Sequence, residues 1–198
     1  MNKITYLAIL VVVSLIAGCV QSLHPLFTEK DLVFNAALVG SWVDKEGKDT
    51  WTFEKSTKDS YAVIHHQLEF EGYIGSKEIP GATSRFQAHL VKLGQFLFLD
   101  LFPEKPETIV RNDLHNFQLI PVHTFWRVWF DGDVFRTAIL DNGWLKKMLD
   151  EKKINIVHDR VDNQIILTAP TKELQTLVLK YAEDDKAFPK PDELHRAN

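Results

Sequence analysis

Cys19 is the only cysteine in the 198-residue chain, and its thiol is the clearest candidate for covalent chemistry. It follows the small residues Ala17 and Gly18 at the end of an apolar run from Ile4 to Ile16, and Lys3 precedes that run. A positive charge, an apolar stretch and a small-residue cleavage site, in this order, are typical of an export signal. The run is shorter than the ~20 residues that a membrane-spanning helix needs.

The stretch Leu15-Ile16-Ala17-Gly18-Cys19 resembles the lipobox of bacterial lipoproteins, in which the cysteine after the cut becomes lipid-modified. The resemblance implies that residues 1–18 are a signal peptide and that Cys19 is the lipidation site, carrying palmitate-like chains. It also implies a protein anchored in the bacterial outer membrane and facing the periplasm, because position 20 lacks the Asp that marks inner-membrane retention. The alternative is an ordinary secretory signal that leaves Cys19 as a free thiol.

The sequence offers no recognisable catalytic, metal or cofactor site. It has no Gly-x-Ser-x-Gly elbow, no phosphate-binding loop, no dinucleotide fingerprint and no His-Glu-x-x-His motif. His65 and His66 are adjacent in an expected strand, so they point to opposite faces and cannot share one ion. We therefore expect a protein that is not an enzyme and needs no cofactor, with an enzyme of unrecognised site as a distant alternative.

Composition narrows the range of partners. The chain has 23 Lys and Arg against 27 Asp and Glu, for a net charge of −4. These charges are interspersed without a basic run, which argues against a nucleic-acid partner. The length after Cys19 suits one domain with its own core.

Secondary-structure patterns indicate a mainly β chain. Short β-branched and aromatic runs separated by turn residues predict strands, at 39–43, 51–53, 61–70, 85–91, 95–101, 123–130, 133–140, 154–161 and 164–167. Asp141 is a suitable cap for a helix that places Trp144 and Leu145 on one face. A second helix after Pro170 has an apolar stripe that begins at Leu174.

A sheet of this size must hide its edges by forming a barrel or a sandwich. A short helical turn, then Gly40-Ser41-Trp42 on the first strand, then up-and-down strands and a late helix, is similar to the lipocalin family. The resemblance implies an antiparallel up-and-down lipocalin-like barrel of about 8–9 strands with two packed helices. The Arg that stacks on this Trp in the family has no clear counterpart, and Arg160 is only a candidate. The alternative makes Trp42 a core aromatic of another β fold.

This reading divides the chain into four parts. Residues 1–18 are the signal peptide, and 19–37 are a tether and lead-in turn. Residues 38–185 form the barrel domain with its C-terminal helix. Residues 186–198, which contain Pro189 and Pro191, are expected to be a flexible tail.

The pair Asp131-Gly132 is the strongest hairpin signal in the chain. If it closes a two-residue turn, Arg127 lies directly opposite Arg136. Like charges in that position destabilise a strand pair unless an anion or a neutral group separates them.

Two placements of this arginine face remain open. Inside the barrel, Arg127 and Arg136 would hold an anionic group, with Phe125, Trp129 and Asp100 completing a ligand site. On the outside, the arginines would be solvated or paired with acids. The exterior placement is favoured because the opposite face of the strand pair is more apolar.

The functional expectation is non-catalytic binding of a small, mostly apolar ligand, with an anionic, fatty-acid-like molecule included. The membrane is a partner through the N-terminal lipid. The main alternative is a structural or protein-interaction module of the cell envelope, because 13 Phe and five Trp could fill the barrel.

Overall fold

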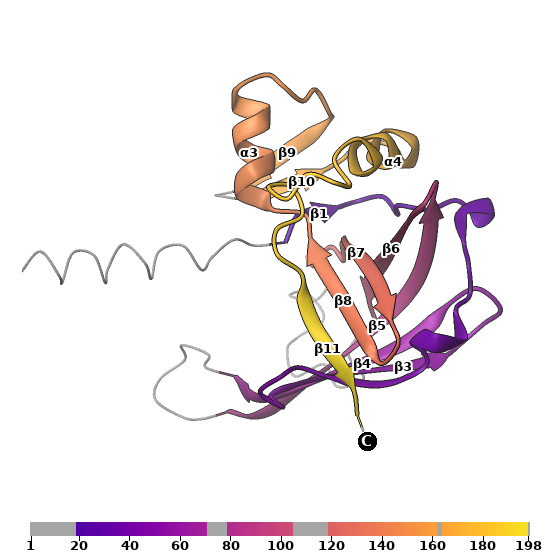
Figure 1. Cartoon of the computed structure of the whole chain (residues 1–198). Helices are drawn as coiled ribbons and strands as arrows, with labels where there is room; N and C mark the ends of the chain where they lie inside the picture. The colour runs from indigo at the N-terminus through magenta and orange to yellow at the C-terminus, as the bar shows by residue number, and fades with distance from the viewer. Residues whose placement is uncertain (1–18, 71–78, 105–118, 162–163, 198) are drawn as a thin grey trace, which may run out of the picture.

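The computed structural model describes residues 19–70, 79–104, 119–161 and 164–197 (Figure 1). Strands dominate, with two α-helices and two short 3-10 turns among the described residues. In chain order the elements are β1 (Gln21–Ser22), η2 (Glu29–Asp31), η3 (Ala36–Leu38), β2 (Gly40–Val43), β3 (Asp49–Lys55), β4 (Tyr61–Phe70), β5 (Ile79–Leu93), β6 (Phe96–Pro103), β7 (His123–Asp131), β8 (Val134–Ile139), α3 (Asn142–Asp150), β9 (His158–Val161), β10 (Gln164–Leu167), α4 (Thr171–Lys180) and β11 (Asp192–Arg196).

Eight of the strands form a closed antiparallel barrel. Strands β2 to β8 pair in sequence, each with the next, including the β6–β7 pair. Strand β11 then lies between β8 and β2 and closes the circle. Closure leaves no barrel strand with an unpaired edge. The expected lipocalin-like barrel with two packed helices is therefore confirmed.

The closing strand β11 comes from a segment that the sequence analysis assigned to a flexible tail. Leu194 pairs with Phe135 of β8, and Arg196 pairs with Trp42 of β2. The assignment of 186–198 as a tail is wrong for the strand residues. The strand pattern is hidden because Leu194 is the only apolar residue of β11, and charged or polar residues surround it.

The barrel encloses one of two hydrophobic cores. Trp42, Phe53, Tyr61 and Phe135 are fully buried inside it, together with leucines of β5 and β6 such as Leu90. These large side chains fill the interior at the closed end, where β2 begins and β11 ends. A cleft lies at the open end, where β2 and β8 end and β7 and β11 begin.

The second core lies outside the barrel wall. After β8 the chain forms α3, β9, β10 and α4, which cover one side of the barrel before β11 returns to it (Figure 1). Outward side chains such as Phe98 and Phe125 pack against Leu145 of α3 and Leu174 of α4. Strand β10 pairs with β9 and with β1, and β1 joins this small sheet to β7.

The N-terminal segment belongs to this outer layer. Residues 19–37 were expected to be a tether, but Cys19 forms a β-bridge with Asp141, and Val20 and Leu26 are buried. The tether assignment is wrong because these apolar side chains gain more from burial in the outer core than from exposure on a linker. The expected lead-in turn is present as η3, directly before β2. Among the described residues, no helix has the length and apolar character needed to cross a membrane.

Candidate functional site

The closed end of the barrel is built around Trp42. Its indole Nε1–H donates to the Leu38 carbonyl at 2.9 Å, and the side chain is fully buried. Arg196 stacks over the ring, with its Cζ 4.4 Å from the ring centroid. The same guanidinium donates to the carbonyls of Val39 and Ala37 at 3.0 and 2.7 Å, so one cation joins the last strand to the lead-in turn.

Arg196 supplies the Trp-stacking arginine that the sequence analysis could not place. The earlier candidate, Arg160, lies on β9 and pairs with Asp150 instead. Gly40 is required at this end because it has φ +122°, and a Cβ there would lie 2.6 Å from Arg196 Nη1. The glycine of Gly40-Ser41-Trp42 therefore makes room for the arginine.

The β7–β8 hairpin has a different register from the predicted one. Its turn is Gly132-Asp133, with Gly132 at φ +60°, so glycine occupies the first central position as in a type II′ turn. Arg127 consequently pairs with Ala138 rather than with Arg136. The predicted opposition of the two arginines is wrong because the hairpin closes one residue later than Asp131-Gly132.

Both arginines lie on the outer face of the barrel. Arg127 stacks on Trp129 and Phe96 and donates to the Ala182 carbonyl, and its burial lowers the pKa of the guanidinium. Arg136 is engaged by two acids, with Glu193 at 2.9 Å and Asp131 at 3.1 Å. Hydrogen bonding to Glu193 and then to Asp131 raises the pKa of Arg136.

The other three predicted ligand residues also lie outside the barrel, and Trp129 packs against the outer core. Phe125 is part of the outer core. Asp100 is fully buried and accepts hydrogen bonds from the Leu26 amide at 2.7 Å and from His123 Nδ1 at 2.6 Å. It thereby fixes the N-terminal segment to the barrel wall. The five predicted residues do not meet around one cavity.

His89 lies beside this buried carboxylate. It pairs with Asp100 in the β5–β6 register, and its ring packs 4.2 Å from that of Phe27. Burial lowers the pKa of His89, and the nearby His123 lowers it further, although Asp100 and Asp59 act in the opposite direction. Folding therefore favours the neutral form of the ring.

The lowered pKa of His89 predicts that the folded protein loses stability as the pH falls. The folded pKa of His89 is below its unfolded value of ~6.5, so the unfolded chain binds the proton first. Stability from this group is fully present above the unfolded pKa and is lost as pH falls toward the folded pKa. We expect the urea midpoint of the native protein to fall between pH 7.5 and 5.5, and to fall less in His89→Gln. Equal falls in the two proteins would contradict this role of His89.

The open end of the barrel holds a cleft of ≈ 740 Å³. Its lining combines apolar walls with a charged rim, and consists of Asp44, Lys45, Glu46, Asp49, Trp51, Trp126, Thr137, Ile139, Lys190, Pro191, Asp192, Glu193 and Leu194. Strands β2, β3, β7, β8 and β11 or their connections contribute these residues. None of the residues named from the sequence as ligand-binding is among them.

Two tryptophans form the aromatic wall of the cleft. Trp51 stacks on His65 at 4.0 Å between centroids and meets Trp126 edge to face at 4.8 Å. Trp126 is only 9% exposed, and its indole Nε1–H has no hydrogen-bond partner among the described residues. A buried N–H without an acceptor costs ~1–3 kcal/mol. Trp126 therefore lines the cleft and carries a buried, unsatisfied donor.

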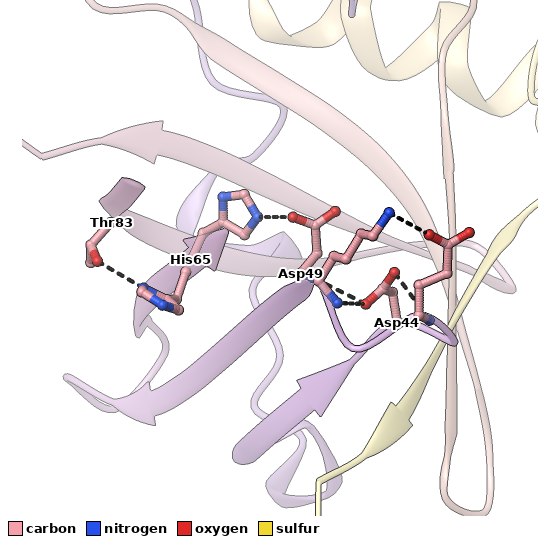
Figure 2. A network of polar contacts seen from close by, with 7 residues as sticks. Asp44, Asp49, His65 and Thr83 are labelled. Atoms are coloured by element: carbon pink, nitrogen blue, oxygen red, sulfur yellow. Dashed lines mark hydrogen bonds and ion pairs between the residues drawn. The ribbon is translucent and has the colours of Figure 1, made fainter. Parts of the chain in front are cut away.

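The turn between β2 and β3 forms part of the charged rim of the cleft. Figure 2 shows Asp44 accepting from the backbone amides of Lys48 and Asp49, at 2.7 and 3.0 Å, while His65 Nε2 lies 3.3 Å from an Asp49 oxygen. Burial alone would raise the pKa of Asp44, but these amide hydrogen bonds outweigh it and lower the pKa. The turn thus presents the carboxylate of Asp44 at a fixed position.

His66 points away from this site. Its Nδ1 lies 3.0 Å from Thr83 Oγ1 on the other face of β4 (Figure 2), as strand alternation requires. Within the described ranges, no group of three His, Cys, Asp or Glu side chains is arranged to hold a metal ion. The tryptophan pair was missed from the sequence because only the strand order brings Trp51 and Trp126 together.

Comparison with protein-family models, with curated proteins and with solved structures gives no match for this chain. What the cleft can bind therefore follows from its own side chains.

Proposed function

We propose that this protein is a lipid-anchored envelope lipoprotein whose lipocalin-like barrel binds a small, mostly apolar ligand without catalysis. The binding site is the open-end cleft. The observation that supports this most is that Trp126, whose buried Nε1–H has no acceptor among the described residues, lines the cleft. A small shift of the ring that turns this N–H toward the cleft would let an acceptor oxygen or nitrogen on a ligand satisfy it.

The size and depth of the cleft fit a small molecule. Its volume of ≈ 740 Å³ is within the range of ~300–1,000 Å³ typical of ligand sites. Because large rings fill the closed end, the ligand lies at the mouth of the barrel, against Trp51 and Trp126. Their flat faces suit an aromatic or aliphatic body.

The rim favours a neutral or cationic ligand over a fatty acid. Five lining residues are acidic and two are Lys. Glu193 and Glu46 have Lys or Arg partners, whereas Asp44, Asp49 and Asp192 have no such ion pair within the described part of the chain. Carboxylates repel a ligand carboxylate, and tryptophan rings attract cations. The anionic ligand considered from the sequence is therefore replaced by a neutral or cationic one.

The anchor is inferred from the lipobox-like residues that end at Cys19. Burial raises the pKa of the Cys19 thiol, so an unmodified thiol would remain protonated and poorly nucleophilic at neutral pH. A structural or lipid-bearing cysteine fits this environment better than a reactive one.

Competition binding tests the ligand proposal. The fluorescent apolar reporter N-phenyl-1-naphthylamine should be displaced by hexyltrimethylammonium and hexanol more readily than by hexanoate. Trp126→Phe keeps the ring but removes the donor, and should weaken hexanol binding roughly tenfold, as expected for one lost hydrogen bond. Trp129→Phe, on the outer face, is the matched control and should change nothing. Preferential binding of hexanoate would contradict the proposed charge selectivity.

A second candidate function is supported by the filled interior. Trp42, Phe53, Tyr61 and Phe135 leave the closed half of the barrel without room for a ligand. A barrel filled in this way would also serve as a rigid interaction module in the envelope. Failure of the reporter and of all three competitors to bind would favour this function over ligand binding.

A further inference from the structure

Exposed apolar side chains gather on one side of the protein. Among the described residues, six large apolar side chains are exposed: Leu23, Leu119, Ile120, Val157, Val161 and Leu179. Leu23, Val157 and Val161 lie in or directly beside the strands of the small β1–β10–β9 sheet. Leu119 and Ile120 lie in the chain that leads into β7, and Leu179 lies on α4. Strand β7 adjoins β1. The distribution therefore marks one region of the surface.

Strand alternation places the exposed apolar residues of the small sheet on its outward face. Val20 and Ser22 are buried, so Cys19 and Leu23 face outward on the β1 side. Backbone hydrogen bonds continue the sheet beyond the paired residues, from the Leu23 amide to the Leu167 carbonyl and from the Thr168 amide to the Val157 carbonyl. The outward row thus runs from Leu23 through Thr168 to Val157.

The two valines of the β9 edge belong to the same face. Val161 pairs with Gln164, and Asp159 pairs with Ile166. Val157 is 59% exposed and Val161 is 53% exposed. We call Leu23, Val157, Val161 and Ile166 the docking face. Its outward positions in the three strands include no Lys or Arg and one acid, Asp159, which is exposed between the two valines.

Cys19, the first described residue, lies at the edge of this face. The apolar run from Ile4 to Ile16 leads to Cys19, which is bridged to Asp141, and the next residue, Val20, is 2% exposed. No spacer separates a lipid on Cys19 from the folded domain. Acyl chains attached to this residue would therefore project from the protein surface next to the docking face.

We propose that the docking face rests directly on the membrane in which Cys19 is anchored, so that the acyl chains and these side chains enter the same lipid layer. The proposal rests on the lipid anchor of the proposed function. The apolar side chains carry the contact, since the face has no basic residue to attract anionic headgroups and its one charge, Asp159, does not attract them. Docking should therefore be insensitive to salt between 50 and 500 mM NaCl.

Depth-dependent quenching tests the docking face. The full-length, lipidated protein is reconstituted into phosphatidylcholine–phosphatidylglycerol vesicles with Val157→Cys, Val161→Cys or, as a control, Leu179→Cys. Because the Cys19 sulfur carries lipid, only the introduced thiol takes up a nitrobenzoxadiazole label. All three positions are exposed, so the substitutions should be tolerated. Labels at 157 and 161 should be quenched by doxyl-phosphatidylcholine at least twofold more than the label at 179.

The outcomes separate docking from anchoring. Weak quenching at all three positions, with fatty acid present on Cys19, would overturn docking and leave the anchor intact. Equal strong quenching at all three would overturn the assignment of this face. A blue shift at 157 and 161 without doxyl quenching, rising with protein density, would identify a second copy as the occupant and overturn membrane docking. Absence of fatty acid on Cys19 would overturn the anchor and docking together.

Discussion

Trp42→Ala is expected to reduce the free energy of unfolding by about 3–5 kcal/mol, the usual cost of removing a fully buried large aromatic side chain. The ring is inaccessible, packs against Phe135 at 5.5 Å between centroids, and donates to the Leu38 carbonyl. Its loss leaves a cavity at the closed end and removes the surface on which Arg196 stacks. Urea denaturation followed by circular dichroism measures the change.

A double-mutant cycle isolates the Trp42–Arg196 contact. Arg196→Ala should itself destabilise, because the guanidinium also joins β11 to the carbonyls of Val39 and Ala37. We expect a coupling energy of roughly 0.5–2 kcal/mol between the two positions. Trp144→Ala, at a half-buried ring outside the barrel, is the control and should not couple to Arg196. An unchanged midpoint in Trp42→Ala would remove the argument for this closure.

Cys19→Ser is expected to have an all-or-none effect on membrane attachment. The hydroxyl cannot replace the thiol in lipid modification, so the variant should take up no labelled fatty acid. It should also leave the membrane fraction or accumulate as the uncleaved chain. Stable anchoring requires two or more acyl chains or a second membrane signal. Metabolic labelling followed by fractionation measures both effects, and labelling that survived the substitution would contradict lipidation at Cys19.

Much of the barrel can be predicted from local patterns. Each barrel strand before residue 140 was predicted, although β5 begins at Ile79 rather than at residue 85. Asp141 is a recognisable cap that accepts from the Trp144 amide. Strand β11 could not be predicted in this way because four of its five residues are charged or histidine. Its pairing depends on Leu194 and Arg196 meeting partners about 150 residues earlier in β2 or about 60 earlier in β8, which no local pattern encodes.

The site was harder to predict than the fold. The hairpin register depends on whether glycine occupies the first or second central position of the turn, and both are common for this sequence type. Because the turn begins one residue later than predicted, Arg127 pairs with Ala138 instead of Arg136. The Trp51–Trp126 wall depends on the curvature of the closed barrel, since the two residues lie on β3 and β7, which do not pair directly. The unsatisfied indole N–H is visible only once its surroundings are known.

The central claim is that the open-end cleft binds its ligand through Trp126, and the indole N–H resonance of that residue tests it most directly. In ¹H–¹⁵N spectra the five tryptophans give five indole signals, and Trp126→Phe assigns the relevant one. Addition of hexanol should move the Trp126 signal downfield as its N–H acquires an acceptor, and should leave the Trp129 and Trp144 signals unchanged. Saturable binding of hexanol that leaves the Trp126 signal in place would contradict the account.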